Sequence, residues 1–195
     1  MSVVLNSFKS LLGVRKKSTS GVESPIDSIK DAVIGDVFTI TGLSIQFEDL
    51  YLIIEKKDRY ESEAGSWHEA LGSDGANSLW LQWSDADSVQ VSAMIDDKPV
   101  GLSTLGINES DLQRMDDEHS IDNTIIFDDI KFSYQQSREA FHFPNGQGRG
   151  QGFYIWEFSS EDQARLISVI KWENTPFQVY FSEVVPLENV TVYKS

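Results

Sequence analysis

The chain has 195 residues, 40% of them hydrophobic and 24% charged, with no cysteine and a formal net charge of −15 at pH 7. This length and composition are typical of one globular domain or two small ones. The lack of cysteine excludes a disulfide framework, a thiol nucleophile and a zinc–thiolate site. No apolar run approaches the roughly 18 residues that a membrane-spanning helix needs. The N-terminus lacks the pattern of a secretory signal, so we expect a cytoplasmic protein.

Positive charge is concentrated at the N-terminus. Residues 1–22 contain four basic residues and no acid, whereas the remainder carries 12 basic and 31 acidic residues, a net charge of −19. An acidic body of this size repels phosphate backbones, so we expect no binding of nucleic acid by the main domain.

Residues 2–13 have the pattern of a short amphipathic helix, and a basic cluster follows it. Such a segment predicts docking on an anionic membrane surface or in the groove of a partner protein. A disordered tail, or a helix packed on its own domain, is the alternative. The docking residues would be Val4, Leu5, Phe8, Leu11, Leu12, Arg15, Lys16 and Lys17.

From Gly35 onward the pattern changes to short runs of β-forming residues separated by Asp, Asn, Gly and Ser. This predicts antiparallel strands joined by tight turns. One interior helix is expected at residues 108–117, with Asn108 as its N-cap. Strands are expected near residues 37–41, 50–56, 78–83, 89–95, 124–134, 152–158, 166–172, 177–181 and 190–193.

Parts of the chain resemble one another. Phe47-Glu48-Asp49-Leu50 is echoed 80 residues later by Phe127-Asp128-Asp129-Ile130. The pairs Trp67/Trp83 and Trp156/Trp172 have the same spacing of 16 residues, and we expect them to pack in the cores of two related units. The predicted fold is mainly β, with antiparallel sheets, few short helices and two related β-meander or half-barrel units packed together. The segments would be an N-terminal segment (1–22), a first β unit (23–107), a helical connector (108–121) and a second β unit (122–195).

No pattern of catalytic residues is present. His68, His119 and His142 do not have the spacing of metal ligands, and no Gly-x-Ser-x-Gly motif occurs. The paired carboxylates, such as Asp96-Asp97 and Asp128-Asp129, fall mainly in expected loops or at strand ends, which favours solvated turns. We therefore expect a protein without enzymatic activity, metal or cofactor. An enzyme that uses clustered carboxylates with Mg²⁺ or Ca²⁺ is the least favoured alternative.

Two residues are candidates for contact with a ligand or partner. In a strand at residues 78–83, Leu79, Leu81 and Trp83 share one face, which leaves Trp80 on the other face to stack on a sugar, a base or a partner. The glycine-rich run at residues 145–152 precedes a strand rather than a helix, so it does not fit a phosphate-binding loop. It predicts a hairpin loop, with a partner-binding flap around Arg149 as the alternative.

Several short motifs occur in a recognisable order. They are Gly35-Asp36-Val37, Trp67-His68-Glu69, Trp80-Leu81, Tyr154-Ile155-Trp156-Glu157-Phe158 and the stretch from Glu188 to Tyr193. Over about residues 34–194 the chain resembles the bacterial domain-of-unknown-function family 4178, and it departs from that pattern in its glycine-rich run and its helix. The resemblance implies no catalytic residues. It does imply an accessory role at the inner membrane, because family members are neighbours of membrane-stress genes, including relatives of phage-shock protein A.

The leading hypothesis is therefore a non-enzymatic adaptor in a bacterial membrane-associated or envelope-stress assembly. Its expected partners are a protein, such as one like phage-shock protein A, and an anionic membrane contacted through the N-terminus. The alternative hypothesis is a ligand-binding module with an aromatic cleft between the two β units.

Overall fold

The computed structural model describes residues 29–44, 47–85, 88–94 and 97–195. Within these residues the fold is mainly β, as predicted. It is one antiparallel sheet of 11 strands in the order β11-β1-β2-β3-β4-β5-β10-β9-β8-β7-β6. None of the helices in these ranges is long and apolar enough to cross a membrane. The predicted N-terminal segment, with all of its proposed docking residues, lies outside the described ranges.

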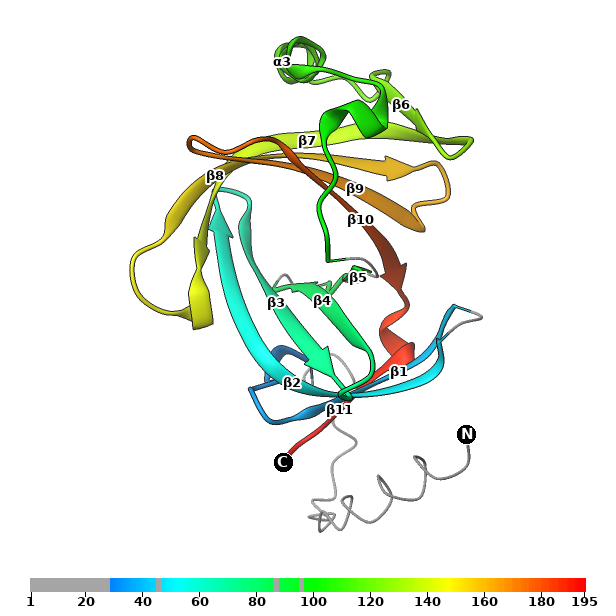
Figure 1. Cartoon of the computed structure of the whole chain (residues 1–195), viewed down its shortest axis with the longest axis vertical. Helices are drawn as coiled ribbons and strands as arrows, with labels where there is room; N and C mark the ends of the chain where they lie inside the picture. Colours follow the sequence, from blue (N-terminus) through cyan, green and yellow to red (C-terminus); the bar gives the residue numbers. More distant parts are fainter. Residues whose placement is uncertain (1–28, 45–46, 86–87, 95–96) are drawn as a thin grey trace.

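The strands form two units of five, and a last strand returns to the first unit (Figure 1). The first unit contains β1 (Val37–Ser44), β2 (Phe47–Ser62), β3 (Gly65–Ser73), β4 (Ser78–Ser84) and β5 (Val91–Met94). The second contains β6 (Thr124–Phe127), β7 (Ile130–Phe143), β8 (Gln151–Ser160), β9 (Arg165–Trp172) and β10 (Gln178–Val185). The last strand, β11 (Val190–Tyr193), pairs with β1.

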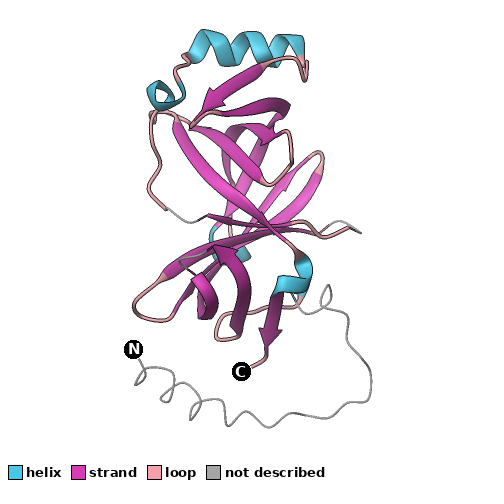
Figure 2. Ribbon diagram, turned by 90° about the vertical axis from the view of Figure 1, so that its right-hand side faces the viewer, coloured by secondary structure: helices cyan, strands magenta, loops and turns pink. Residues whose placement is uncertain are grey.

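Two pairings between the units close the sheet into a ring. On one side β5 pairs with β10, with Ala93 opposite Glu183. On the other side β2 pairs with β7, with Tyr60 opposite His142. The ring therefore consists of β2, β3, β4, β5, β10, β9, β8 and β7, while β1, β11 and β6 lie outside it. Figures 1 and 2 show one unit above the other, with the long strands crossing between them.

Each unit has a β-bulge in its longest strand. In β2 the register against β3 shifts between Ile54 and Lys56, which leaves Glu55 as the extra residue. In β7 the register against β8 shifts between Tyr134 and Gln136, eighty positions later in the chain. Because side chains alternate along a strand, one extra residue moves the following even-numbered side chains to the other face of the sheet.

The two larger hydrophobic cores lie on the outer faces of the ring. In the first unit, Leu81 and Trp83 of β4 are completely buried beneath β1, β11 and residues 29–32. In the second unit, Phe158 of β8 and Ile167 of β9 are completely buried in a core that also contains helix α3 (Glu109–Glu118). Each unit therefore has a core outside the ring, while a smaller third cluster of buried side chains lies inside the ring where β2 meets β7; it consists of Trp67, Ala140, Phe153 and Ile155.

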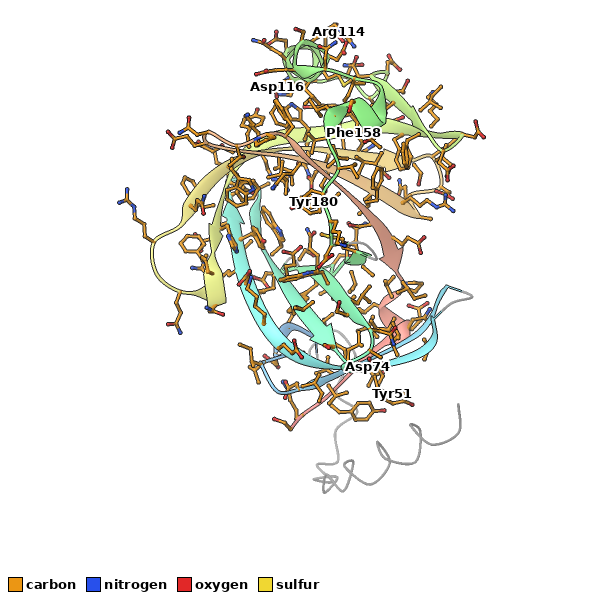
Figure 3. The ribbon with its side chains drawn as sticks, in the orientation of Figure 1. Tyr51, Asp74, Arg114, Asp116, Phe158 and Tyr180 are labelled. Carbon is orange, nitrogen blue, oxygen red and sulfur yellow. The ribbon has the colours of Figure 1, made fainter. Side chains whose placement is uncertain are left out.

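Helix α3 confirms the interior helix predicted from the sequence. The Asn108 side chain accepts hydrogen bonds from the backbone N–H groups of Ser110 and Asp111, and the Asp111 carboxylate accepts one from the backbone N–H of Asn108. These reciprocal bonds satisfy N–H groups that the helix itself leaves free. On its inner side the Asp116 carboxylate accepts a 2.9 Å hydrogen bond from the Tyr154 hydroxyl of β8, and Figure 3 labels Asp116 below the helix. Three short 3₁₀ turns complete the fold: η1 (Leu102–Leu105), η2 (Pro144–Gly146) and η3 (Leu187–Asn189).

Two details of the predicted repeat are wrong. Residues 124–134 form two strands rather than one, because Asp128 and Asp129 adopt positive φ angles of 51° and 59° and make a two-residue hairpin turn. The Phe127–Ile130 segment is thus a hairpin, whereas Phe47–Leu50 lies in β2. When the units are aligned at their bulges, Trp83 corresponds to Lys171 rather than to Trp172.

Candidate functional site

The inside of the ring contains a cavity of about 220 Å³ between the two units. Figure 3 labels Tyr180, which lies between the units on this inner side. Each of the eight ring strands contributes at least one side chain to the wall, and Asp97 adds one from the segment after β5. The wall consists of Lys56, Asp58, Tyr60, Trp67, Glu69, Trp80, Gln82, Met94, Asp97, His142, Phe153, Ile155, Ser168, Ile170, Trp172, Tyr180 and Ser182.

Stacked rings form the part of the wall where β2 meets β7. Tyr60 lies between Trp67 and His142, with ring centroids 5.2 Å and 4.7 Å away. Phe153 contacts the edge of this stack and lies 4.6 Å from the ring of Trp172. The aromatic rings thus join β2, β3, β7, β8 and β9 across the boundary between the units, and they form a stiff apolar wall.

Asp58 anchors the same region through polar contacts. Its side chain is 2% exposed and lies 2.7 Å from the Lys56 ammonium and 3.0 Å from Nε2 of His142. It also accepts a 2.8 Å hydrogen bond from the backbone N–H of Asn145, at the start of the glycine-rich loop. Burial alone would raise the pKa of Asp58, but these bonds from Lys56, Asn145 and His142 outweigh burial and hold that pKa below its ordinary value.

Glu69 is in a different environment. It lies on β3 opposite Gln82 of β4, and its Oε2 accepts a 2.7 Å hydrogen bond from the Tyr60 hydroxyl. Burial, followed by the nearby charge of Asp58, raises the pKa of Glu69 despite this bond. Burial raises the pKa of Tyr180, and the negative charges of Glu69 and Asp97 raise it further.

The hollow continues toward the other mouth of the ring. A second space of about 440 Å³ shares Trp67 and Gln82 with the first. Its wall includes Arg138, whose guanidinium pairs with the Glu157 carboxylate at 2.5 Å and lies 5.4 Å from the ring centre of Trp67. The Gln136 side chain donates a 2.8 Å hydrogen bond to the same carboxylate. This end of the hollow is polar, whereas the other end is aromatic and acidic.

Trp80 lies inside the ring. The predicted division of its strand is confirmed, since Leu79, Leu81 and Trp83 are buried in the first core while Trp80 and Gln82 line the cavity. The Lys56 ammonium lies 5.0 Å from the ring centre of Trp80, within the range of a cation–π interaction.

Arg149 is not brought together with Trp80. It is exposed in the loop between β7 and β8 and does not line the cavity. The base of this loop, however, is tied to the cavity wall by the bond from Asn145 to Asp58. Among the glycines of this loop, Gly150 has the least space for a side chain, since a Cβ atom there would lie 2.8 Å from the Phe143 ring.

The tryptophan pairs pack in cores as expected, but not all of them in a core of their own unit. Trp83 and Trp156 pack in the outer cores, whereas Trp67 and Trp172 pack in the cluster inside the ring, which joins the two units. Sequence reasoning also missed Asp58 and Glu69 as wall residues. A bulge decides which way Asp58 points, and Glu69 lies on a strand that the sequence did not predict.

In the part of the chain that the structure describes, no three His, Asp or Glu side chains are arranged to hold a metal ion. A family model described as "Domain of unknown function (DUF4178)" matches residues 41–187. The matched region includes every strand of the ring. No curated protein and no solved structure matches the chain.

Proposed function

Because the chain belongs to this family of unknown function, whose description names no activity, we propose a function from the ring itself: a non-enzymatic module that binds a small organic ligand between its two β units. The wall residues Trp80, Glu69 and Tyr180 would contact this ligand.

One observation carries the proposal, namely that the two larger cores lie outside the ring. The inside of a small closed sheet is usually filled by its own side chains. Here the outer faces bury most of the large apolar side chains, including Trp83 and Phe158, while Trp67, Phe153 and Ile155 pack one side of the interior. The inside instead holds a hollow with aromatic rings, carboxylates, amides and hydroxyls in its wall.

The composition of the wall supports the same proposal. Ligand sites are mostly apolar and aromatic surfaces with a few polar groups that fix the orientation of the ligand. Trp80 and Trp172 would supply the apolar surface, while Glu69, Tyr180 and Gln82 would supply hydrogen bonds. With a volume of about 220 Å³, the aromatic end suits a small molecule.

Tryptophan fluorescence tests this function, because three of the five tryptophans, Trp67, Trp80 and Trp172, line the cavity. We expect a saturable change with at least one member of a panel of sugars, nucleosides, amino acids and amines. The variant Ser168→Trp would fill the cavity and should abolish that response. Thr191→Trp, at an exposed strand position on β11, is the matched control and should retain it. No saturable response to any member would count against the proposal.

We also propose a second function, docking of the N-terminal segment on an anionic membrane or a partner protein as part of an adaptor. The difference between the +4 segment and the −19 remainder favours it, since clustered basic residues contribute about 1 kcal/mol each near an anionic surface. Co-sedimentation with anionic and neutral liposomes should show binding by the full chain and none by a chain that begins at Gly21. If neither binds, a pull-down from lysate tests the protein partner. Deleting residues 1–17 should leave the unfolding midpoint unchanged.

A further inference from the structure

The charged side chains of the cavity are unequally compensated. Asp58 has Lys56, His142 and a backbone N–H as partners. At the other mouth of the ring, Glu157 is paired with Arg138. The cations present inside the ring are therefore already engaged with these two carboxylates.

Glu69 is less fully compensated, because the nearby positive charge is that of Lys56, which already pairs with Asp58. Among the described residues it makes no ion pair, and its one hydrogen bond comes from the neutral Tyr60 hydroxyl on Oε2. Asp97, which lines the same cavity, likewise makes no ion pair with a described residue. A carboxylate held inside a protein without a cation is costly, so it either takes up a proton or attracts a positive charge. The raised pKa of Glu69 indicates that the site disfavours the bare anion.

Two further features suit a cation. The Lys56 ammonium already lies 5.0 Å over the Trp80 ring, which places an aromatic face of the wall within reach of positive charge. The net charge of −19 on residues 23–195 would also raise the local concentration of cations and repel anions.

We propose that the aromatic end of the cavity binds a small organic cation, an amine or quaternary ammonium compound, whose positive charge lies beside Glu69 and whose carbon atoms lie against Trp80. This inference rests on the proposed ligand-binding function and assigns its ligand class. Asp97, at the edge of the cavity, adds to the negative potential without burying its own charge. Tyr180 forms the facing wall.

Two matched pairs of probes test the charge of the ligand. Calorimetric titration would compare n-butylammonium with 1-butanol, and choline with 3,3-dimethylbutan-1-ol, in which a carbon atom replaces the nitrogen. We expect at least one cation to bind saturably and at least tenfold more tightly than its neutral counterpart. Equal binding within every pair that binds, or binding of the alcohols alone, would overturn the cation assignment and leave the proposed ligand-binding function in place. Failure of both cations would overturn it as well, while the fluorescence panel decides the proposed function separately.

Variants of the full chain test the position of the charge. Glu69→Gln keeps the shape of the side chain and should reduce the preference for the cation to about threefold or less. Glu188→Gln, at an exposed position on η3, removes the same charge away from the cavity and should leave the preference unchanged. Asp97 is exposed, so Asp97→Asn tests the same negative potential at a position where a substitution perturbs folding little. It should lower the preference for the cation about twofold. An undiminished preference in a folded Glu69→Gln protein would refute the role of Glu69.

Discussion

Asp58 should be among the most sensitive polar residues of the ring, and Asp58→Asn tests this. Its carboxylate joins β2 to β7 through His142 and to the glycine-rich loop through Asn145. An amide at this position presents only one acceptor to three donors, and its own N–H groups face the Lys56 ammonium or the His142 ring. At least one donor therefore loses its partner in a nearly closed site.

The expected loss in the free energy of unfolding follows from how exposed each partner of Asp58 is. The Lys56 side chain is 41% exposed, so its pair contributes at most about 1 kcal/mol. His142 is 16% exposed and the Asn145 bond is to backbone, and a hydrogen bond to a charged group typically contributes about 1.5–3 kcal/mol. Since asparagine can keep one of these bonds, we expect a loss of about 3 kcal/mol. In a chain of this length that corresponds to a decrease in Tm of roughly 6–12 °C.

Urea denaturation at pH 7 measures the free energy of unfolding, and limited trypsin digestion provides an independent measure. The exposed Arg149 lies in the loop that Asp58 holds at Asn145, so cleavage after Arg149 should become faster in Asp58→Asn. The control is Asp122→Asn, in the exposed turn before β6, where the carboxylate accepts no hydrogen bond from a described residue. This control should change stability by less than about 0.5 kcal/mol.

The difference between wild type and Asp58→Asn should depend on pH. The pKa of Asp58 is lower in the folded protein than the ordinary value of about 3.9. Its contribution to stability is therefore fully present above about pH 4 and is lost as the pH falls through the lower folded pKa. A loss below 1 kcal/mol at pH 7, with unchanged cleavage after Arg149, would refute this account of the network.

Three further substitutions or conditions test other parts of the structure. Gly72→Ala should destabilise the protein by about 1–3 kcal/mol in urea denaturation, because the new Cβ would lie 2.7 Å from Cβ of Leu52 in the first core. Trp83→Ala should lower the free energy of unfolding by about 3–5 kcal/mol, whereas Trp80→Ala, on the cavity side of the same strand, should cost less than half of that. Cation affinity should rise with pH through the raised pKa of Glu69, because binding favours the ionised carboxylate, and calorimetry at several pH values should show a flat profile for Glu69→Gln. Other charged or titratable groups facing this carboxylate, which stay unchanged in that variant, are Lys56, Asp58, Tyr60, Asp97, His142 and Tyr180.

Each of these expectations has a contradicting result. For Gly72 the control is Gly101→Ala, at an ordinary φ of −87° with only the Ser103 hydroxyl near the new Cβ, and equal losses in the two variants would remove the steric explanation. Equal costs for Trp80→Ala and Trp83→Ala would mean that Trp80 is packed as tightly inside the ring as Trp83 is in the first core. A pH profile retained in Glu69→Gln would assign the titration to one of the other groups.

Much of the architecture could be predicted from the sequence. The alternation in residues 78–83 separated Trp80 from Leu79, Leu81 and Trp83, and the structure confirms that separation. Asn108 predicted the start of helix α3, because a side-chain acceptor followed by acidic residues satisfies the first N–H groups of a helix. These features depend on neighbours in the sequence, and so a single sequence contains the information.

The candidate site depends on features that are not local. Even-numbered residues of β2 face the first core up to Ile54 and face the cavity from Lys56 onward, because Glu55 is a bulge. No residue type in this stretch marks the bulge, and without it Asp58 would point toward the core. The pairing of Tyr60 with His142 joins segments that are 82 positions apart, and nothing in either segment specifies the other.

The choice of the inner face could not be predicted for the same reason. In β9, Ile167 and Val169 pack in the second core, while Ile170 and Trp172 line the cavity, so both faces of this strand carry apolar side chains. The alternation of side chains divides a strand into two faces, but it does not show which of the two faces the cavity. The inner face is the one that no flanking segment of the described chain covers. Helix α3 covers the outer face of the second unit, and β1, β11 and residues 29–32 cover that of the first. Because these flanking segments complete the larger cores from outside, the inner faces pack against each other mainly where β2 meets β7, around Trp67 and Phe153. The wall residues are thereby free to carry the carboxylates and aromatic rings that a ligand would contact.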